Sequence, residues 1–155
     1  MKMHMPQLLC LALTTAGLTL GTSAGNANAG EVNTGYFGDV AIKGYDPVAY
    51  FTDSKAVRGS EEHSYKWLNT TWYFSNDEHR RAFVASPISY APQYGGLCAE
   101  GVAAHGEATV NIEPESWQII DGKLYLSAAA SFQDRPLDVA ASEAKWPIAH
   151  SKLTQ

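Results

Sequence analysis

The dipeptide Asp121-Gly122, placed between two short apolar segments, constrains the fold of this chain more than any other feature of its sequence. The flanking segments 117–120 and 123–126 combine aromatic and aliphatic residues of the kind that favour strands. Asp-Gly is a typical two-residue hairpin turn, because both turn positions need a positive φ. A similar signal lies at residues 64–74, where Asn69-Thr70 separates two aromatic segments. The sequence therefore predicts two antiparallel hairpins.

Helices are predicted between and after these hairpins. Ser75 and Glu78 form a capping box, which predicts a helix that ends near Ser86, before Pro87. Further helices are predicted at 97–105, closed by Gly106, at 127–133, and at 138–146, stopped by Pro147. Gly101 is unfavourable inside its helix and indicates the close approach of another backbone. Hairpins separated by helices, without a βαβ order, indicate one small α+β domain.

Composition and charge exclude several classes of protein. The chain has 155 residues, of which 45% are hydrophobic and 17% charged, as is typical of one globular domain. Its net charge of −5 leaves no basic surface for a phosphate backbone, so nucleic acid is not an expected partner. Two cysteines are too few for a disulfide-stapled small protein or for a four-cysteine zinc site.

The N-terminal residues are typical of a secretory signal peptide. Lys2 precedes an apolar stretch from Leu8 to Leu20, and the small residues Ala27-Asn28-Ala29 follow it. The stretch is shorter than the ~20 residues that a membrane-spanning helix needs, so cleavage is expected in place of anchoring. We therefore expect a signal peptide at 1–29, one mature domain at 30–155 without a transmembrane segment, and a periplasmic or secreted location.

Cleavage there removes Cys10 and leaves Cys98 as the lone cysteine of the exported chain. A lone cysteine cannot form an internal disulfide. If Gly95-Gly96 start the helix, the Cys98 thiol lies in its first turn, where the dipole favours a thiolate that acts as a nucleophile or a metal ligand. The alternative is a buried cysteine that packs as a small hydrophobic residue.

His79 is a candidate partner for Cys98. It lies four residues before Phe83 on one helix face, so an inward Phe83 brings His79 toward the core. A Cys–His pair from two helices could hold Cu(I) or Zn(II) with a third donor, or could place a thiol beside a base. The alternative is a polar residue at the margin of a capped helix. His105 is expected at a helix C-terminus, where a cation satisfies the dipole.

A series of ordered motifs covers most of residues 42–147. They are Gly44-Tyr45-Asp46-Pro47-Val48-Ala49-Tyr50-Phe51, Ala56-Val57-Arg58-Gly59-Ser60, Trp72-Tyr73-Phe74-Ser75, Phe83 with Pro87 and Tyr90, Ala91-Pro92-Gln93-Tyr94-Gly95-Gly96-Leu97-Cys98-Ala99, and Asp121-Gly122-Lys123-Leu124-Tyr125-Leu126. This order resembles the YHS domain, in its secreted or periplasmic branch. The resemblance implies a small α+β domain related to modules found beside copper- and mercury-handling proteins, in which cysteines hold a soft metal ion.

This chain departs from the metal-binding YHS pattern at three positions. Ala49 and Ser75 stand where relatives carry cysteines, and His79 replaces a further cysteine. A soft cation such as Cu(I) prefers thiolate ligands, and this chain lacks cysteines at these three positions. The pattern puts a ligand at the position of His79, and we predict a copper or zinc site formed by Cys98 and His79.

We therefore expect an exported YHS-like binding domain that handles a transition metal such as copper, with a metal ion or a metal-handling protein as its partner. One alternative is a thiol-reactive redox protein that uses Cys98, and another is a metal-free scaffold or small-ligand-binding module. The sequence contains no Gly-x-Ser-x-Gly, His-Glu-x-x-His, phosphate loop or Cys-x-x-Cys, so no established catalytic motif indicates an enzyme. The sequence leaves the oligomeric state open.

Overall fold

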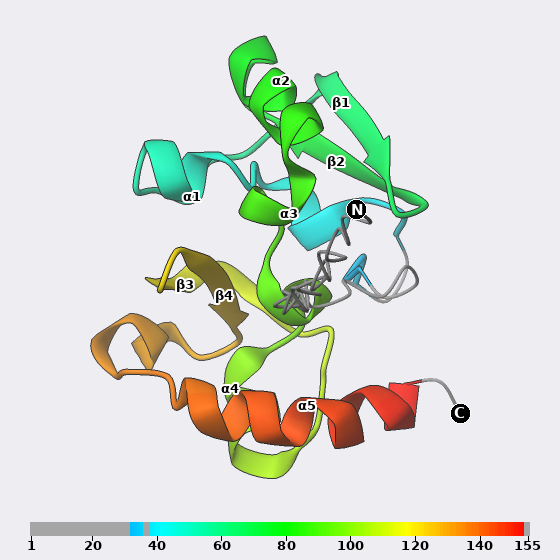
Figure 1. Ribbon diagram of the computed structural model, residues 1–155. Helices are drawn as coiled ribbons and strands as arrows, with labels where there is room; N and C mark the ends of the chain where they lie inside the picture. The colour runs from blue at the N-terminus through cyan, green and yellow to red at the C-terminus, as the bar shows by residue number, and fades with distance from the viewer. Residues whose placement is uncertain (1–31, 36–37, 154–155) are drawn as a thin grey trace, which may run out of the picture.

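The computed structural model of the protein describes residues 32–35 and 38–153, and the predicted signal peptide lies outside them. The described chain is a small α+β domain, which confirms the predicted fold class (Figure 1). With η marking a 3-10 turn, its elements in chain order are η1 (Ala41–Gly44), α1 (Ala49–Thr52), β1 (Ser60–Trp67), β2 (Thr70–Phe74), α2 (Asp77–Ala85), α3 (Pro87–Tyr90), η2 (Gln93–Gly96), α4 (Ala99–His105), β3 (Glu113–Ile120), β4 (Lys123–Ser127), η3 (Ala130–Asp134) and α5 (Val139–Leu153).

The first hairpin, β1–β2, turns one residue earlier than predicted. Leu68 and Asn69 occupy the turn with φ of 50° and 59°, and β2 starts at Thr70. The register follows from burial, because Thr70, Trp72 and Phe74 alternate with half-exposed neighbours and face the core. The hairpin is confirmed, and the burial pattern of β2 fixes where it turns.

The second hairpin, β3–β4, forms where Asp121-Gly122 predicts it. Both turn residues have positive φ, 51° and 72°, and Ile120 pairs with Lys123 across the turn. Each hairpin also gains one short parallel bridge, from Val40 to β2 and from Cys98 to β4. The two hairpins belong to separate two-stranded sheets, with α2 against β1–β2, α3 between α2 and β4, and α4 with α5 on the side of β3–β4 (Figure 1).

Two hydrophobic cores hold the described chain together. The first core consists of the buried residues Ala41, Ile42, Val48, Tyr50, Trp72, Phe74, Phe83, Cys98, Ile112, Leu124 and Leu126. Phe83 of α2 is fully buried there, as the sequence predicts, and its ring lies 5.0 Å from that of Trp72 and 5.2 Å from that of Phe74. These ring contacts attach α2 to the first hairpin.

The second core joins α4, α5 and the second hairpin. It consists of the buried residues Tyr94, Leu97, Ala99, Val102, Tyr125, Phe132, Leu137 and Ala149. Lys145 of α5 donates from Nζ to the carbonyls of Ala103 and Ala104, at 2.6 and 3.0 Å, and so satisfies the C-terminal end of α4. Gly106 follows α4 with a left-handed φ of 62°, which confirms the predicted C-terminal glycine.

The closing segments differ from their prediction. The helix predicted at 127–133 is wrong, because Ser127 ends β4 and only the short turn η3 follows, at Ala130–Asp134. The helix α5 continues through Pro147 to Leu153. A proline inside a helix removes one backbone hydrogen bond but fits helical φ. Packing of the buried Ala149 in the second core supports the helix beyond Pro147. Among the described residues, no helix has the length and apolar character needed to cross a bilayer.

Asn33 connects segments that are far apart in sequence. Its Nδ2 donates to the carbonyls of Gly96 and Val110 at 2.9 and 3.0 Å, and its backbone N–H donates to Gly95 at 2.8 Å. Its own carbonyl accepts from Ile42 at 3.0 Å. The residue is 3% exposed, and it fastens the start of the described chain to the turn between the two cores.

Candidate functional site

Cys98 lies at the boundary of α4 and not inside its first turn. It is the N-cap residue, with extended backbone angles, and its N–H donates to Thr109 O at 3.0 Å. The residue is 6% exposed and belongs to the first core. The predicted close approach of another backbone to Gly101 is confirmed. A Cβ at Gly101 would lie 2.8 Å from the carbonyl oxygen of Glu107, which is too close. Cys98 is therefore a buried N-cap residue that packs in the first core immediately before α4.

The polar surroundings of the Cys98 sulfur are limited to one hydroxyl. In the part of the chain that the structure describes, Ser127 is the one side chain within hydrogen-bonding distance of Sγ, at 3.7 Å from its Oγ. The Ser127 hydroxyl donates to Glu100, which pairs with Arg135 at 2.6 Å. These contacts connect the sulfur to a surface ion pair and bring no imidazole to it.

His79 is the third residue of α2 and is tied to a buried carboxylate. Its Nδ1 lies 2.6 Å from Oδ2 of Asp46, and its side chain is 10% exposed. Asp46 is fully buried. A buried carboxylate needs partners for its charge, and an imidazole that donates from Nδ1 is one of them.

The remaining contacts of Asp46 hold its carboxylate in one orientation. Oδ1 accepts the N–H groups of Val48 and Ala49, at 2.9 and 3.4 Å, at the start of α1. Oδ2 accepts the N–H and the hydroxyl of Ser75, at 2.8 and 2.7 Å, in addition to His79. Asp46 thus links α1, the end of β2 and α2. The sequence predicts a turn at Asp46-Pro47, and it gives no sign of a partner 33 residues away.

The predicted capping role of Ser75 is wrong. Asn76 is the N-cap of α2, and its side-chain oxygen accepts the N–H of His79 at 2.9 Å. Asparagine is as good an N-cap as serine. The hydroxyl of Ser75 is needed by Asp46, because the buried carboxylate is costly unless its oxygens are hydrogen-bonded.

The other nitrogen of the imidazole faces the rim of the molecule. Nε2 of His79 lies 3.2 Å from Oγ1 of Thr52 and 3.9 Å from Oδ1 of Asp53, at the end of α1. The Thr52 hydroxyl also lies 2.9 Å from that Asp53 oxygen. Thr52 and Asp53 are both exposed. The site therefore presents a hydroxyl and a carboxylate to solvent, with the largely buried imidazole and Asp46 behind them.

The structure does not bring Cys98 and His79 into contact. Their hydrogen-bonding partners are different, Ser127 for the sulfur and Asp46 with Thr52 for the imidazole. Within the described residues, no group of three or more His, Cys, Asp and Glu side chains is placed to hold a metal ion. The pairing of Cys98 with His79 on one ion stays a prediction, and the carboxylate that the fold places beside Nε2 is Asp53.

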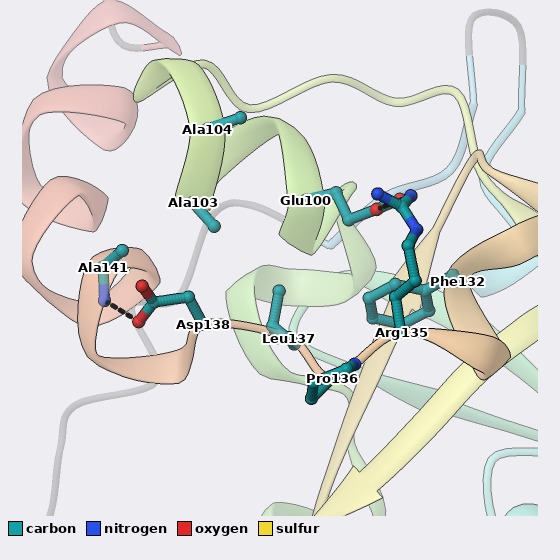
Figure 2. A pocket seen from close by; sticks show the side chains of 9 residues that line it. All are labelled: Glu100, Ala103, Ala104, Phe132, Arg135, Pro136, Leu137, Asp138 and Ala141. Carbon is teal, nitrogen blue, oxygen red and sulfur yellow. Dashed lines mark hydrogen bonds and ion pairs between the residues drawn. The ribbon is translucent and has the colours of Figure 1, made fainter.

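A cavity of about 240 Å³ lies between α4 and the segment that leads into α5. Figure 2 shows its lining residues, which are Glu100, Ala103, Ala104, Phe132, Arg135, Pro136, Leu137, Asp138 and Ala141. Arg135 pairs with Glu100, and Asp138 accepts the N–H of Ala141 at 2.9 Å. The polar groups of this cavity thus have structural partners, and its volume is below the ~300 Å³ at which small-molecule pockets begin. The rim at His79 is the stronger candidate site.

Comparison with known proteins adds no relative to this picture. No family model, no curated protein and no solved structure matches the chain. The resemblance to the YHS domain therefore stays a prediction from the motifs of the sequence.

Proposed function

We propose that the protein is an exported YHS-like binding domain that binds a divalent transition metal ion, copper or zinc, through Nε2 of His79. The observation that carries the proposal is the buried contact of 2.6 Å between Nδ1 and Asp46. Metal-binding histidines commonly donate their second ring N–H to a carboxylate, which fixes the ring and raises the basicity of the ligating nitrogen. Asp46 gives His79 this support and directs Nε2 to the exposed rim.

The geometry at the rim fits such an ion. Zinc lies ~2.0–2.1 Å from an imidazole nitrogen and ~2.0–2.2 Å from a carboxylate oxygen, so two donors of a tetrahedral ion lie about 3.4 Å apart, and the exposed Asp53 side chain would approach Nε2 by about 0.5 Å on binding. Nε2 and Oδ1 of Asp53 are 3.9 Å apart. The Thr52 hydroxyl lies 3.2 Å from Nε2 and 2.9 Å from that oxygen, and it is the third donor. Imidazole with oxygen donors suits Cu(II) and Zn(II), whereas Cu(I) selects soft sulfur ligands.

Calorimetric titration of the purified protein with Cu(II), Zn(II) and Cu(I) tests this assignment. We expect His79→Gln to lower the affinity for Cu(II) and Zn(II) by more than ~10-fold, since loss of an outer partner alone costs about 10–100-fold. Asp53→Asn is also expected to weaken binding, and it changes an exposed side chain at the end of α1. Cys98→Ser is the matched control and should bind as the parent does.

Two results contradict the proposed site. Equal affinity in the parent, His79→Gln and Asp53→Asn would remove it, and loss of binding in Cys98→Ser would return the site to the cysteine. Circular dichroism of each variant shows whether the fold is kept, so that a lost site is distinguished from a lost structure.

The alternative of a thiol-reactive protein depends on access to Cys98. At 6% exposure the thiol is enclosed by the first core. We expect iodoacetamide to modify Cys98 only after denaturation, as measured by mass spectrometry. Modification of the native protein at the rate of a free thiol would support the redox alternative in place of the metal site.

A further inference from the structure

The site at His79 also contains a hydroxyl, an imidazole and a carboxylate in sequence. Thr52 is the last residue of α1, His79 lies in the first turn of α2, and Asp46 precedes α1. Oγ1 of Thr52 lies 3.2 Å from Nε2, and Nδ1 lies 2.6 Å from Asp46. We propose that, in the protein without a bound metal ion, Thr52 is a nucleophile that accepts acyl groups from activated esters, with His79 as its general base and Asp46 as the positioning residue.

The chain of contacts from the Thr52 hydroxyl through the His79 imidazole to the Asp46 carboxylate is the one found around hydroxyl nucleophiles. In such sites the base touches the hydroxyl with one ring nitrogen, and a buried carboxylate holds the other nitrogen, so the correct tautomer and orientation are kept. Asp46 is fully buried, and its four other hydrogen bonds prevent it from turning away from His79. The imidazole therefore remains directed at Thr52.

An incoming ester can reach this hydroxyl. Thr52 is exposed, whereas the His79 side chain is 10% exposed, so the ring is covered and its partner is presented to solvent. Because Thr52 is exposed at the end of α1, its hydroxyl is open to a small activated ester such as an acetyl ester. The substrate class is an ester of a short carboxylic acid with a good leaving group.

Asp53 opposes this reaction in the native chain. Its Oδ1 lies 2.9 Å from Oγ1 and competes with Nε2 for the hydroxyl proton, as does the carbonyl of Val48 at 3.2 Å. Its negative charge also disfavours the oxyanion that forms on the attacked carbonyl. Removing the charge of Asp53 should therefore speed acylation, although the same change weakens the proposed metal site.

The step balances without a further reactant. Oγ1 of Thr52 forms a bond to the carbonyl carbon of p-nitrophenyl acetate, and the Oγ1 proton passes to Nε2 of His79. The bond from that carbon to the phenolate oxygen breaks, and the electron pair leaves with p-nitrophenolate. The proton on Nε2 then passes to solvent or to the leaving group, which leaves acetyl-Thr52 and p-nitrophenol.

The test follows p-nitrophenolate release and acetylation of residue 52 by peptide mass spectrometry, on the purified protein in the presence of a chelator. General-base assistance contributes ~100–10,000-fold, so we expect His79→Gln to slow acetylation of Thr52 by about 100-fold. Thr52→Ser should retain the reaction, Thr52→Val should remove it, and Asp53→Asn should increase its rate. Acetylation of the exposed Lys55 nearby is the internal control and should be equal in all variants.

Two outcomes overturn this inference. One is an acetyl group that is absent from residue 52 in both the parent and Asp53→Asn, and the other is an equal rate in the parent and His79→Gln. The failure of the metal site would be seen separately, because Asp53→Asn is expected to lower metal affinity and to raise acylation. Circular dichroism identifies any variant that has lost its fold, and Thr52→Val and Asp53→Asn alter exposed side chains.

Discussion

The two cores treat their buried polar groups in opposite ways. In the first core, the Tyr50 hydroxyl donates to Pro114 O at 2.9 Å, and the adjoining Asp46 has a partner for each oxygen. In the second core, the hydroxyls of Tyr94 and Tyr125 are buried and have no hydrogen-bond partner in the described chain. In the first core, hydrogen bonds hold buried polar side chains in position. In the second core, Tyr94 and Tyr125 contribute through the packing of their rings.

This difference explains where the candidate site lies. A buried group with all its hydrogen bonds made is held in one place, and it can orient a neighbour such as His79. The Tyr94 ring packs 4.8 Å from Trp146 and 5.9 Å from Tyr125, which gives burial without a direction for the hydroxyl. Stability measurements can therefore separate the two cores by the cost of removing a polar group from each.

The largest expected effect is that of Asp46→Ala. Removal of one partner from a buried, hydrogen-bonded pair costs about 3–5 kcal/mol, because His79 and several N–H groups are left unpaired. Urea denaturation measures the free energy of unfolding. Ser142→Ala is the control beside the second core, since it removes the bond from a buried hydroxyl to Asp138 O, worth about 1 kcal/mol, together with a neighbour of the Tyr94 hydroxyl. Equal losses in the two variants would contradict the comparison.

The second effect concerns a glycine beside each core. A Cβ on Gly59 would lie 2.4 Å from the backbone carbon of Tyr73 in β2, and one on Gly101 would lie 2.8 Å from Glu107 O in a loop. We expect Gly59→Ala to cost about 1–3 kcal/mol through overpacking against a fixed strand. Gly101→Ala should cost less, because alanine in a helix recovers about 1 kcal/mol relative to glycine. Thermal unfolding of both variants ranks them, and the reverse order would show that the loop after α4 is the more rigid neighbour.

The third effect compares tyrosine hydroxyls directly. Tyr50→Phe leaves the carbonyl of Pro114 without its donor and should cost about 1 kcal/mol. Tyr125→Phe removes a hydroxyl that has no partner, so the free energy of unfolding should be unchanged or higher. Chemical denaturation of the Tyr50→Phe and Tyr125→Phe variants measures both free energies of unfolding. A substantial loss of stability in Tyr125→Phe would mean that its hydroxyl has a partner after all.

The smallest effect is the pH dependence of an exposed pair on α2. Hydrogen bonds from Arg80 and then from Arg81 hold the pKa of Asp77 below its usual range. A lowered pKa in the folded state gives stability that is present above the unfolded pKa, ~3.9, and is lost as the pH falls through the folded value. Asp77→Asn should therefore lower the melting temperature slightly at pH 7 and have no effect at strongly acidic pH. A difference that grows as the pH falls would contradict this sign.

Local patterns in the sequence predict the local structure well. Asp121-Gly122 places the second hairpin, Gly106 closes α4, and the position of Phe83 places it in the first core. Each of these depends on turn chemistry or on periodicity, which act over a few residues. The continuation of α5 through Pro147 was missed because packing of the buried Ala149 supports the helix there.

The candidate site was predicted only in part. His79 was chosen from the sequence, but its contact with Asp46 joins residues 33 positions apart, and no periodicity reports such a contact. The pairing of Asp46 with Ser75 also explains why Asn76, and not Ser75, caps α2. Tertiary hydrogen bonds to a buried carboxylate take precedence over a local capping rule, because leaving that charge unpaired costs more than exchanging one cap for another.

The hydrogen bonds of Asn33 set a limit on how far the N-terminus can be shortened. The expected cut before Gly30 lies only a few residues ahead of the side chain that binds Gly96 and Val110. An aminopeptidase that advanced past Asn33 would remove these hydrogen bonds and leave the buried carbonyl of Gly96 and the partly buried carbonyl of Val110 without this donor. If the predicted cleavage before Gly30 takes place, the stability of the domain depends on an N-terminus that trimming enzymes do not shorten past Asn33.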